Sequence, residues 1–331
     1  MRHQALGCKM AERSRFLICC ALVLTSCGGD GSSSGGLTAV PGSPTPSPSP
    51  TSTPTSTPAG ATGELKPSAT SAAFATTQFL TITGATQTLA GGSTTSRSVT
   101  GLNSAFSLSY DAASRTYTLH NEERSQSFGP ASFASETSVP DYFPRVEYHL
   151  ASADTEDFLV FFKQANSSPA IITNYSAYGA WQHNQSQASG TRTRLDYFIY
   201  GTPTPISSMP HSGVVTYRWF GTGNYSSDTQ LYFTQSYNTM TVDFSTGQVT
   251  TSIVLTGSDF LNDSFGGLIG MTFSGQISGN AIDGPLLFTQ TTYTGSAHIV
   301  FFGPNAENVG IVYSASSPLS ATFNGAAVGT Q

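Results

Sequence analysis

The sequence FFGPNAENVG, residues 301–310, connects two apolar runs near the end of the chain. Pro304 fixes φ and Asn305 tolerates the left-handed region, so together with Gly303 they predict a tight turn. Glu307 is expected to accept backbone N–H groups within this turn. Because no His, Ser or second carboxylate accompanies it in the segment, the motif is interpreted as a structural connection that closes a β-structure, not as an active-site loop. The residues assigned to the turn are Gly303, Pro304, Asn305, Glu307 and Gly310.

Alternation of apolar and polar residues extends upstream from this turn. In GMTFSGQI, residues 270–277, the side chains of Met271, Phe273 and Ile277 share one face and the polar residues share the other. This two-residue period, with breaks at Gly, Asn, Asp and Ser, predicts half-buried antiparallel strands. No helical pattern of any length is found from residue 64 onward. The eight candidate strands are 213–220, 229–235, 239–244, 248–256, 269–277, 281–290, 293–302 and 308–328, the last with a break that could split it.

Eight short strands with tight turns predict an antiparallel β-barrel, since closure removes exposed strand edges. Such a barrel is just filled by its own side chains, or it holds one small ligand. A membrane-spanning barrel is the alternative, and its strands need about 9–11 residues with aromatic girdles at both interfaces. Several candidate strands look shorter, and the chain ends in VGTQ without an aromatic residue, so a water-facing barrel is expected.

A first folded unit is predicted at residues 64–208, and the barrel at 209–331. The two-proline run TPTPISSMP, residues 202–210, marks the boundary, because an extended chain that pairs poorly suits a domain junction. The expected fold class is therefore all-β, with an N-terminal β domain followed by an eight-stranded antiparallel barrel. The candidate strands of the first unit are TQFLTIT, SAFSLSY, RTYTLHN, RVEYHL, DFLVFFK and TRLDYFIYG.

The N-terminus has the pattern of a lipoprotein signal peptide at residues 1–26. Arg13 and Arg15 precede the apolar run FLICCALVLTS, which is too short to span a bilayer. Small residues then lead into Cys27. This arrangement resembles the bacterial lipobox, whose cysteine becomes the lipidated first residue after cleavage. An ordinary signal peptide with an incidental cysteine is the alternative, and Met10 is an alternative start.

Residues 27–63 carry the predicted lipid attachment point and a tether rich in Pro, Ser and Thr. The tether has almost no large apolar side chains, so it cannot bury enough surface to fold. Gly28 stands where an Asp would suggest retention in the inner membrane, which favours the outer membrane. Several acyl chains at Cys27 would hold the protein to the membrane without a transmembrane helix. The folded part would then be displayed at the cell surface or face the periplasm.

Charge and cysteine content exclude several classes of protein. Charged residues make up 10% of the chain, and the net charge is −6. Four of the 13 basic residues lie in the leader, which leaves no basic stripe for a nucleic-acid partner. All four cysteines lie within the first 27 residues, so no disulfide scaffold is expected in the folded part.

No catalytic or metal-binding pattern stands out in the sequence. The five histidines that follow the leader show neither H-x-x-x-H nor H-E-x-x-H spacing. The acidic residues at 154–157 lack the spacing of a calcium loop. Residues 122–124, EER, are interpreted as a solvated turn. We therefore expect no enzyme, no metal site and no cofactor.

Aromatic residues are the remaining candidates for ligand binding. The segments NYSAYGAWQHN and YRWFGTGNY place Tyr, Trp and Phe beside Gly and Asn. Exposed Tyr and Trp make effective interface anchors because they bury a large area with few torsions. The alternative is that these rings fill the cores of the two domains. The candidate ligand-binding residues are Tyr178, Trp181, Trp219 and Tyr225.

The C-terminal motifs carry a family resemblance. FFGPNAENVGIVYSA (301–315) followed by SATFNGAAVG (320–329) resembles the closing hairpin and last strand of the barrel domain of transferrin-binding protein B. MPHSGVVTYRWFGTG (209–223) resembles the entry of that barrel, and MTVDFSTGQVTTSI (240–253) resembles its Asp-Phe-x-x-Gly hairpin. The resemblance covers about 200–331 well. It departs from the family at Asn308, Ile311, Ala326 and Ala327.

The resemblance implies a single-lobe surface lipoprotein with one handle domain, 64–208, and one barrel. Residues 64–200 resemble the family's handle only loosely, so transferrin is not carried over as the partner. The expected function is capture of a host or environmental ligand, a protein or haem, in iron acquisition, with a TonB-dependent receptor as a further partner. A structural or adhesive envelope lipoprotein without a soluble ligand is the alternative. A small-molecule binder inside the barrel is a third hypothesis.

Overall fold

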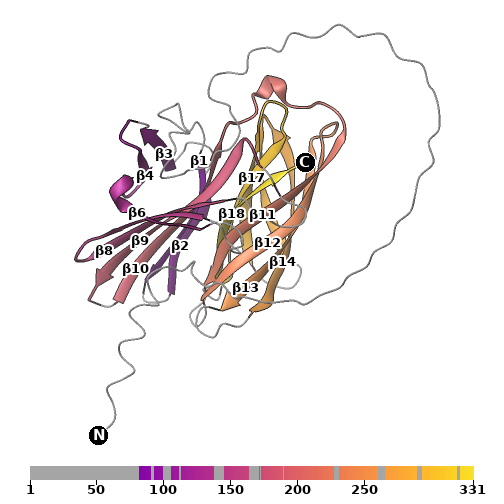
Figure 1. Cartoon of the computed structure of the whole chain (residues 1–331). Helices are drawn as coiled ribbons and strands as arrows, with labels where there is room; N and C mark the ends of the chain where they lie inside the picture. The colour runs from indigo at the N-terminus through magenta and orange to yellow at the C-terminus, as the bar shows by residue number, and fades with distance from the viewer. Residues whose placement is uncertain are drawn as a thin grey trace, which may run out of the picture.

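The computed structural model describes residues 82–90, 93–99, 106–111, 113–137, 145–163, 171, 173–188, 190–226, 231–259, 265–288, 293–318 and 321–331. Every regular element in these ranges is a β-strand or a short 3-10 turn. The predicted all-β fold with a closed eight-stranded barrel is therefore confirmed (Figure 1). The predicted signal peptide (1–26), Cys27 and the tether (27–63) lie outside the described residues. In the described ranges, no helix has the length and apolar character needed to cross a bilayer.

The last eight strands form the barrel in sequence order, each antiparallel to the next. Pairing of β11 with β18 completes the ring, so every barrel strand is paired on both sides. The strands are β11 (Val214–Ser226), β12 (Leu231–Asp243), β13 (Gln248–Asp259), β14 (Phe265–Ser278), β15 (Ala281–Phe288), β16 (Thr294–Phe302), β17 (Asn308–Ser316) and β18 (Thr322–Thr330).

The predicted number of barrel strands is correct. The predicted division between 229–235 and 239–244 is wrong, whereas the break foreseen within 308–328 does split that segment. Candidates 229–235 and 239–244 form a single strand, β12, and candidate 308–328 splits into β17 and β18. The strand continues through Asn238 because its side-chain Oδ1 accepts the backbone N–H of Val254 at 3.2 Å, where the ladder between β12 and β13 is interrupted.

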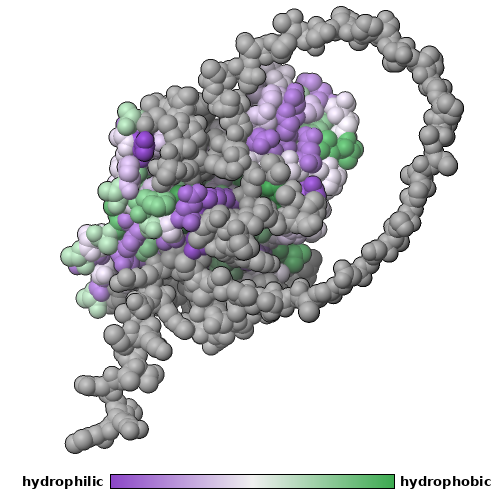
Figure 2. All heavy atoms as spheres, in the orientation of Figure 1, coloured by the Kyte–Doolittle hydropathy of each residue, from purple (hydrophilic) through white to green (hydrophobic). Residues whose placement is uncertain are grey.

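Strand length does not argue against a membrane-spanning barrel, as the sequence had suggested, because β11 to β14 have 12 to 14 residues. The direction of the side chains, however, does argue against a membrane-spanning barrel. In β12, Met240 and Val242 are buried inside the barrel, while Thr239 and Thr241 are exposed outside. Most of the barrel surface visible in Figure 2 is hydrophilic. A membrane-spanning barrel has the opposite distribution, with an apolar band outside.

Two sheets precede the barrel, and we call them together the handle. The first has seven strands in the order β2-β1-β10-β9-β8-β7-β6, and the second has three in the order β3-β4-β5. The strands are β1 (Ile82–Ala90), β2 (Ser93–Val99), β3 (Phe106–Asp111), β4 (Thr116–Asn121), β5 (Ser125–Phe128), β6 (Phe133–Thr137), β7 (Arg145–Ala151), β8 (Thr155–Phe162), β9 (Ser176–Gln187) and β10 (Gly190–Gly201). The 3-10 turns are η1 (Pro130–Ser132) and η2 (Ile206–Ser208).

The seven-stranded sheet is buried on both faces. In β8, Phe158, Val160 and Phe162 belong to a core shared with the outside of the barrel. Leu159 and Phe161, between them, belong to a second core under the three-stranded sheet. Double burial explains why this strand reads as a nearly continuous apolar run. Figure 1 shows the sheet between the three-stranded sheet and the barrel.

The turn at residues 301–310 contributes to both sides of the barrel wall. Phe301 points inward, and its ring centre lies 6.0 Å from that of Tyr217 and 5.6 Å from that of Phe244. Phe302 points outward and is fully buried in the core shared with the handle. Two adjacent aromatic residues therefore fill two different cores, which answers why the sequence places them together.

Hydrogen bonds to Glu307 shape the turn itself. Its carboxylate accepts the backbone N–H of Asn305 at 2.9 Å and the side-chain Nδ2 of Asn305 at 3.0 Å. The left-handed conformations lie at Gly303 (φ 89°) and Ala306 (φ 60°). The expectation that Asn305 would supply this conformation is therefore wrong, because both its backbone and its side chain are committed to Glu307.

The start of β17 holds the handle directly. Asn308 is buried, and its Oδ1 accepts the backbone N–H groups of Asn174 and Tyr175, both at 2.9 Å. At Gly310, an added Cβ would lie 2.7 Å from the end of the Ile199 side chain of β10 and 2.9 Å from the Phe302 ring, so a larger residue would force these side chains of the handle and barrel to shift. These contacts join segments that are more than a hundred residues apart in sequence.

The junction between handle and barrel is itself paired. The backbone N–H of Thr204 donates to the carbonyl of Phe301 at 2.9 Å, and that of Gly303 donates to the carbonyl of Thr202 at 2.9 Å. The sequence had predicted a poorly pairing junction at 202–210. That prediction is wrong at its first residues, because the closing turn of the barrel provides a partner for them.

Replacing Asn308 with Ala should destabilise the whole protein. The change leaves two backbone N–H groups without their acceptor at a buried position, which costs about 1–3 kcal/mol. Asn305→Ala is the matched control, because Asn305 is exposed and its bond to Glu307 contributes about 1 kcal/mol or less. Urea unfolding measures both variants. Equal losses of stability would contradict the role given to Asn308.

Buried tyrosines predict unfolding at alkaline pH. Burial raises the pKa of Tyr117, Tyr148, Tyr178 and Tyr313 above the ordinary value of 10.0. Because the folded state keeps these phenols neutral, their contribution to stability is complete below the ordinary value and is lost as the pH rises above it. Tyrosinate absorbance and loss of β-sheet circular dichroism should appear in one cooperative step. Gradual ionisation with the sheet signal retained would speak against this.

Candidate functional site

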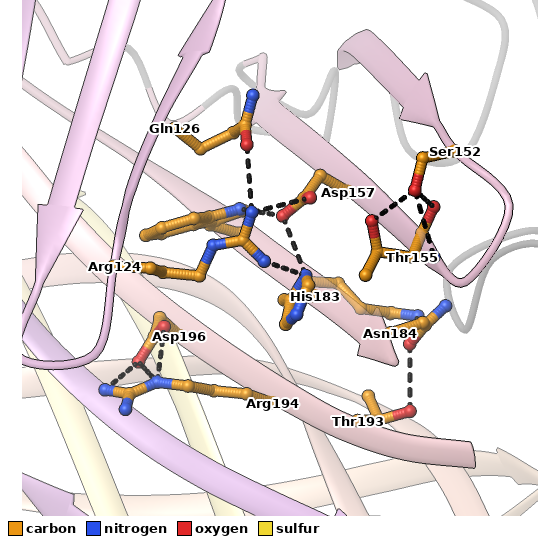
Figure 3. Close-up of polar contacts among 12 residues, drawn as sticks. Arg124, Gln126, Ser152, Thr155, Asp157, His183, Asn184, Thr193, Arg194 and Asp196 are labelled. Atoms are coloured by element: carbon orange, nitrogen blue, oxygen red, sulfur yellow. Dashed lines mark hydrogen bonds and ion pairs between the residues drawn. The ribbon is translucent and has the colours of Figure 1, made fainter. Parts of the chain in front are cut away.

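The basic side chains of the folded chain are concentrated in the handle. Between residues 209 and 331, Arg218 is the only Arg or Lys. In β10, Arg194 alternates with Leu195, which packs towards the barrel, so Arg194 lies on the face turned away from the barrel. On this face β8, β9 and β10 meet the turn between β4 and β5, as Figure 3 shows. We call it the outer face of the handle.

Arg124 is the centre of a first cluster on the outer face. Its guanidinium donates to Asp157 Oδ2 at 3.0 Å and to Gln126 Oε1 at 2.9 Å, and it contacts His183 Nδ1. It also lies 5.5 Å from the ring centre of Trp181. Asp157 accepts the Trp181 indole N–H at 3.0 Å and lies 3.1 Å from His183 Nδ1. The buried carboxylate is thus paired and hydrogen-bonded, as a buried charge requires.

Arg194 is the centre of a second cluster. Its guanidinium donates to the carboxylate of Asp196 at 3.0 to 3.2 Å and reaches Glu122 at 3.2 Å and Glu123 at 2.9 Å. Arg192 pairs with Glu123 at 3.0 Å. The side chains of Glu122, Glu123 and Arg192 are 57%, 37% and 34% exposed, so a partner can reach them from solvent.

The second cluster favours the charged forms of its members. Burial alone would raise the pKa of Glu123. The guanidinium groups of Arg194 and Arg192 lower this pKa by more than burial raises it, so it lies below the ordinary value. Burial lowers the pKa of Arg194, yet Asp196 and the two glutamates raise it above the ordinary value. The carboxylate of Glu123 therefore stays ionised at neutral pH.

Strand register brings the two clusters together. Arg194 of β10 pairs with His183 of β9, and His183 pairs with Asp157 of β8. One row of residues thus crosses three strands with a cation at one end and a carboxylate at the other. Such cross-strand neighbours interact on the surface of a sheet.

The turn between β4 and β5 supplies the remaining members. Asn121 Oδ1 accepts the backbone N–H groups of Glu123 and Arg124, both at 3.0 Å, which fixes the turn. Asn121 Nδ2 donates to Asp196 Oδ2 at 3.0 Å, which fastens the turn to β10. The interpretation of residues 122–124 as a solvated turn is therefore wrong in part, because Arg124 is held by partners on β8 and β9.

The outer face presents charged groups that a partner can reach. In the described ranges, no group of three or more His, Cys, Asp or Glu side chains is placed to hold a metal ion. The solvent-accessible carboxylates of Glu122 and Glu123 and the guanidinium of Arg192 are able to form charge-assisted hydrogen bonds with a partner. Complementary charges of this kind set specificity and association rate more than affinity.

Of the four aromatic candidates from the sequence, only Trp181 contributes to the outer face, where it lies beneath Arg124. Tyr178, Trp181 and Trp219 are 2%, 1% and 0% exposed, so they are core residues and not exposed anchors. The alternative interpretation, that these rings fill the cores, is correct for the three. Tyr225 is partly buried at the edge of the barrel core. The outer face itself was missed, because its members come from three strands and a turn, up to 75 residues apart in sequence, and share no local motif.

Comparison with known proteins finds similarity only among solved structures. No protein-family model matches the chain, and no curated protein sequence matches it significantly. The chain is similar to transferrin-binding protein B of Haemophilus parasuis Hp5, with 13% identity, a TM-score of 0.48 and coverage of 76% of this chain and 45% of that one. It is also similar to intact Ap-TbpB with both lobes, with 13% identity, a TM-score of 0.45 and coverage of 76% of this chain and 46% of that one. For the N-lobe of lactoferrin-binding protein B of Moraxella bovis, the identity is 12%, the TM-score is 0.31, and the match covers 56% of this chain and 79% of that one.

The chain therefore spans less than half the length of the first two proteins. At these identities and TM-scores the similarity assigns neither a family nor a ligand. The description of the fold rests on the strands and their pairing in this chain.

Arg124→Met should loosen the three-stranded sheet. The variant loses the ion pair with Asp157 and the contact with Trp181, and it leaves a buried carboxylate without its cation, which costs about 3 kcal/mol. Arg192→Met is the matched control, because its exposed pair with Glu123 contributes about 1 kcal/mol or less. Chemical denaturation compares the two, and similar small losses in both would rule out a supporting role for the first cluster.

Proposed function

We propose that this protein is a lipid-anchored surface protein that binds a protein ligand through the outer face of its handle. The observation that carries the proposal is the solvent-accessible group of Glu122 and Glu123, in the turn between β4 and β5, and Arg192 on a sheet that is packed on both sides. Rigid support favours binding, since little conformational freedom is lost on association.

The anchor comes from the sequence. Residues 1–26 act as the signal peptide, Cys27 carries the acyl chains, and residues 27–63 form the tether that holds the handle (64–208) and the barrel (209–331) away from the outer membrane. A tether in extended, proline-rich conformation spans roughly 3.1 Å per residue, which lets the outer face reach a large partner.

The sequence motifs of the barrel suggest the class of ligand. The motifs at 301–315 and 209–223 resemble the barrel of transferrin-binding protein B, which supports an iron-carrying protein or haem as the ligand. Delivery to a TonB-dependent receptor would then follow capture. The weak resemblance of the handle supports a partner other than transferrin. A structural or adhesive envelope protein without a soluble ligand is the competing function.

Anchoring and display are tested on intact cells. The protein should incorporate labelled palmitate, and Cys27→Ser should abolish the label and release the chain from the membrane fraction. Protease added to intact cells should remove the folded part if it is displayed outside. Protection of the folded part in intact cells, with cleavage after the outer membrane is opened, would place it in the periplasm and favour the competing function.

Ligand capture is tested with the purified protein. Immobilised protein should retain an iron-carrying protein, or bind haem in a spectroscopic titration. The double variant Glu122→Gln, Glu123→Gln should weaken retention of a protein about three- to tenfold, as expected for loss of charge-assisted bonds. Asp283→Asn, an exposed acidic residue on the barrel, is the control and should change nothing. No binding of either class would remove the iron-related proposal.

A further inference from the structure

The interior of the barrel holds three buried hydroxyls for which the described residues provide no hydrogen bond of ordinary geometry. Thr234 and Ser236 of β12 pair with Gly223 and Gly221 of β11, and these two positions share the inward face with Trp219. Tyr313 of β17 is part of the same inner core. We call Thr234, Ser236 and Tyr313 the inner hydroxyl group.

All three side chains are removed from solvent. Thr234 and Tyr313 are 0% exposed, and Ser236 is 2% exposed. The hydroxyls of Thr234 and Ser236 lie near enough to lower the pKa of Tyr313, although burial raises it more. None of the three hydroxyls makes a hydrogen bond of ordinary geometry. Buried polar groups are nearly always hydrogen-bonded, so these hydroxyls, which lie near one another without bonds of ordinary geometry, retain donors and acceptors that a ligand can use.

The opposite half of the interior behaves differently. There the hydroxyl of Tyr217 donates to the carbonyl of Ala306 at 2.5 Å, and the indole N–H of Trp219 donates to Thr251 Oγ1 at 3.3 Å. The polar groups near the turn at 301–310 therefore have hydrogen bonds of ordinary geometry within the protein, whereas the inner hydroxyl group does not. The difference confines the candidate site to the half of the barrel near the end of β11 and the start of β12.

Glycine residues leave room for the Tyr313 side chain beside the barrel wall. A Cβ added at Gly325 would lie 2.4 Å from the Tyr313 hydroxyl, and one added at Gly223 would lie 2.8 Å from it. The ring of Tyr313 therefore lies against the wall formed by β11 and β18. In this position its hydroxyl lies near Thr234 and Ser236.

Aromatic rings stand between the inner hydroxyl group and the end of the barrel. Ring centres are 4.8 Å apart for Tyr225 and Phe323, 5.2 Å for Tyr293 and Phe323, and 5.3 Å for Phe288 and Tyr293. Tyr225, Phe288 and Tyr293 are only partly buried, while Phe323 is buried. We call these four residues the rim aromatics. They present ring faces and edges on which a flat ligand packs well.

We propose that the barrel binds one small neutral molecule, with a flat apolar body among the rim aromatics and a hydroxyl or carbonyl head at the inner hydroxyl group. The ligand is neutral because no inward-facing side chain whose burial the structure describes is charged. An apolar enclosure with a few convergent polar groups is the usual form of a small-molecule site, and the mouths of β-barrels are a common place for it. The site is separate from the outer face of the handle.

The test uses three probes of the same shape with the purified folded protein. 2-Naphthol carries a neutral hydroxyl, naphthalene carries no polar head, and 2-naphthalenesulfonate carries a charge. Calorimetric titration should show one saturable site for 2-naphthol, weaker binding of naphthalene and none of the sulfonate. Equal affinity for all three probes, or no saturable binding of 2-naphthol, would overturn the proposal.

Variants locate the site. Tyr313→Phe and Thr234→Val keep the shape of the side chain and remove a hydroxyl, so each should weaken 2-naphthol about three- to tenfold and leave naphthalene unchanged. Ser236→Ala provides a third variant should either of these fail to fold. Tyr178→Phe, a buried tyrosine outside the barrel, is the control for folding and should change neither probe. Equal losses for both probes, or for the control, would contradict the assigned head group.

Discussion

The structure depends on two adjacent aromatic residues that face opposite sides of one β-strand. Phe301 enters the barrel and Phe302 enters the core shared with the handle, because successive side chains of a strand alternate. The turn that follows then holds the junction at Thr202 and Thr204 through backbone hydrogen bonds, and the loop before β9 through Asn308. Closure of the barrel and attachment of the handle are therefore one event, and neither core is complete without this segment.

Sequence periodicity was sufficient for the barrel and for five strands of the handle, β3, β4, β7, β8 and β10, but it was insufficient for strands such as β9. Barrel strands face water on one side, so their alternation is visible, as in Met240 and Thr241. It failed at Asn238, which resembles a turn residue but completes the strand with its side chain. The sequence left open whether the aromatics of β9 are exposed or buried, because Gly179 and Ala180 interrupt the alternation of the strand. Both of its faces are buried, Trp181 on one side and Tyr178 on the other, so neither face is polar enough to reveal a strand.

The same reasoning explains why the candidate site was not predicted. A turn such as residues 301–310 can be predicted from a short stretch of sequence, since Glu307 contacts a residue only two positions away. The outer face of the handle is assembled by strand register, with Arg194, His183 and Asp157 as neighbours across three strands. Register is set by the cores beneath it. The positions of the accessible carboxylates thus depend on apolar core residues that no binding motif would include. A loss of core packing would therefore also disturb the proposed binding surface.

Amide hydrogen exchange on the folded protein tests the central claim most directly. If the segment around Phe301 and Phe302 unites the two cores, amides in β9 and β10 should exchange with the same opening free energy as amides in β16 to β18, because these strands open only together. The account is contradicted if the handle strands exchange through a separate, far less costly opening while the barrel remains protected.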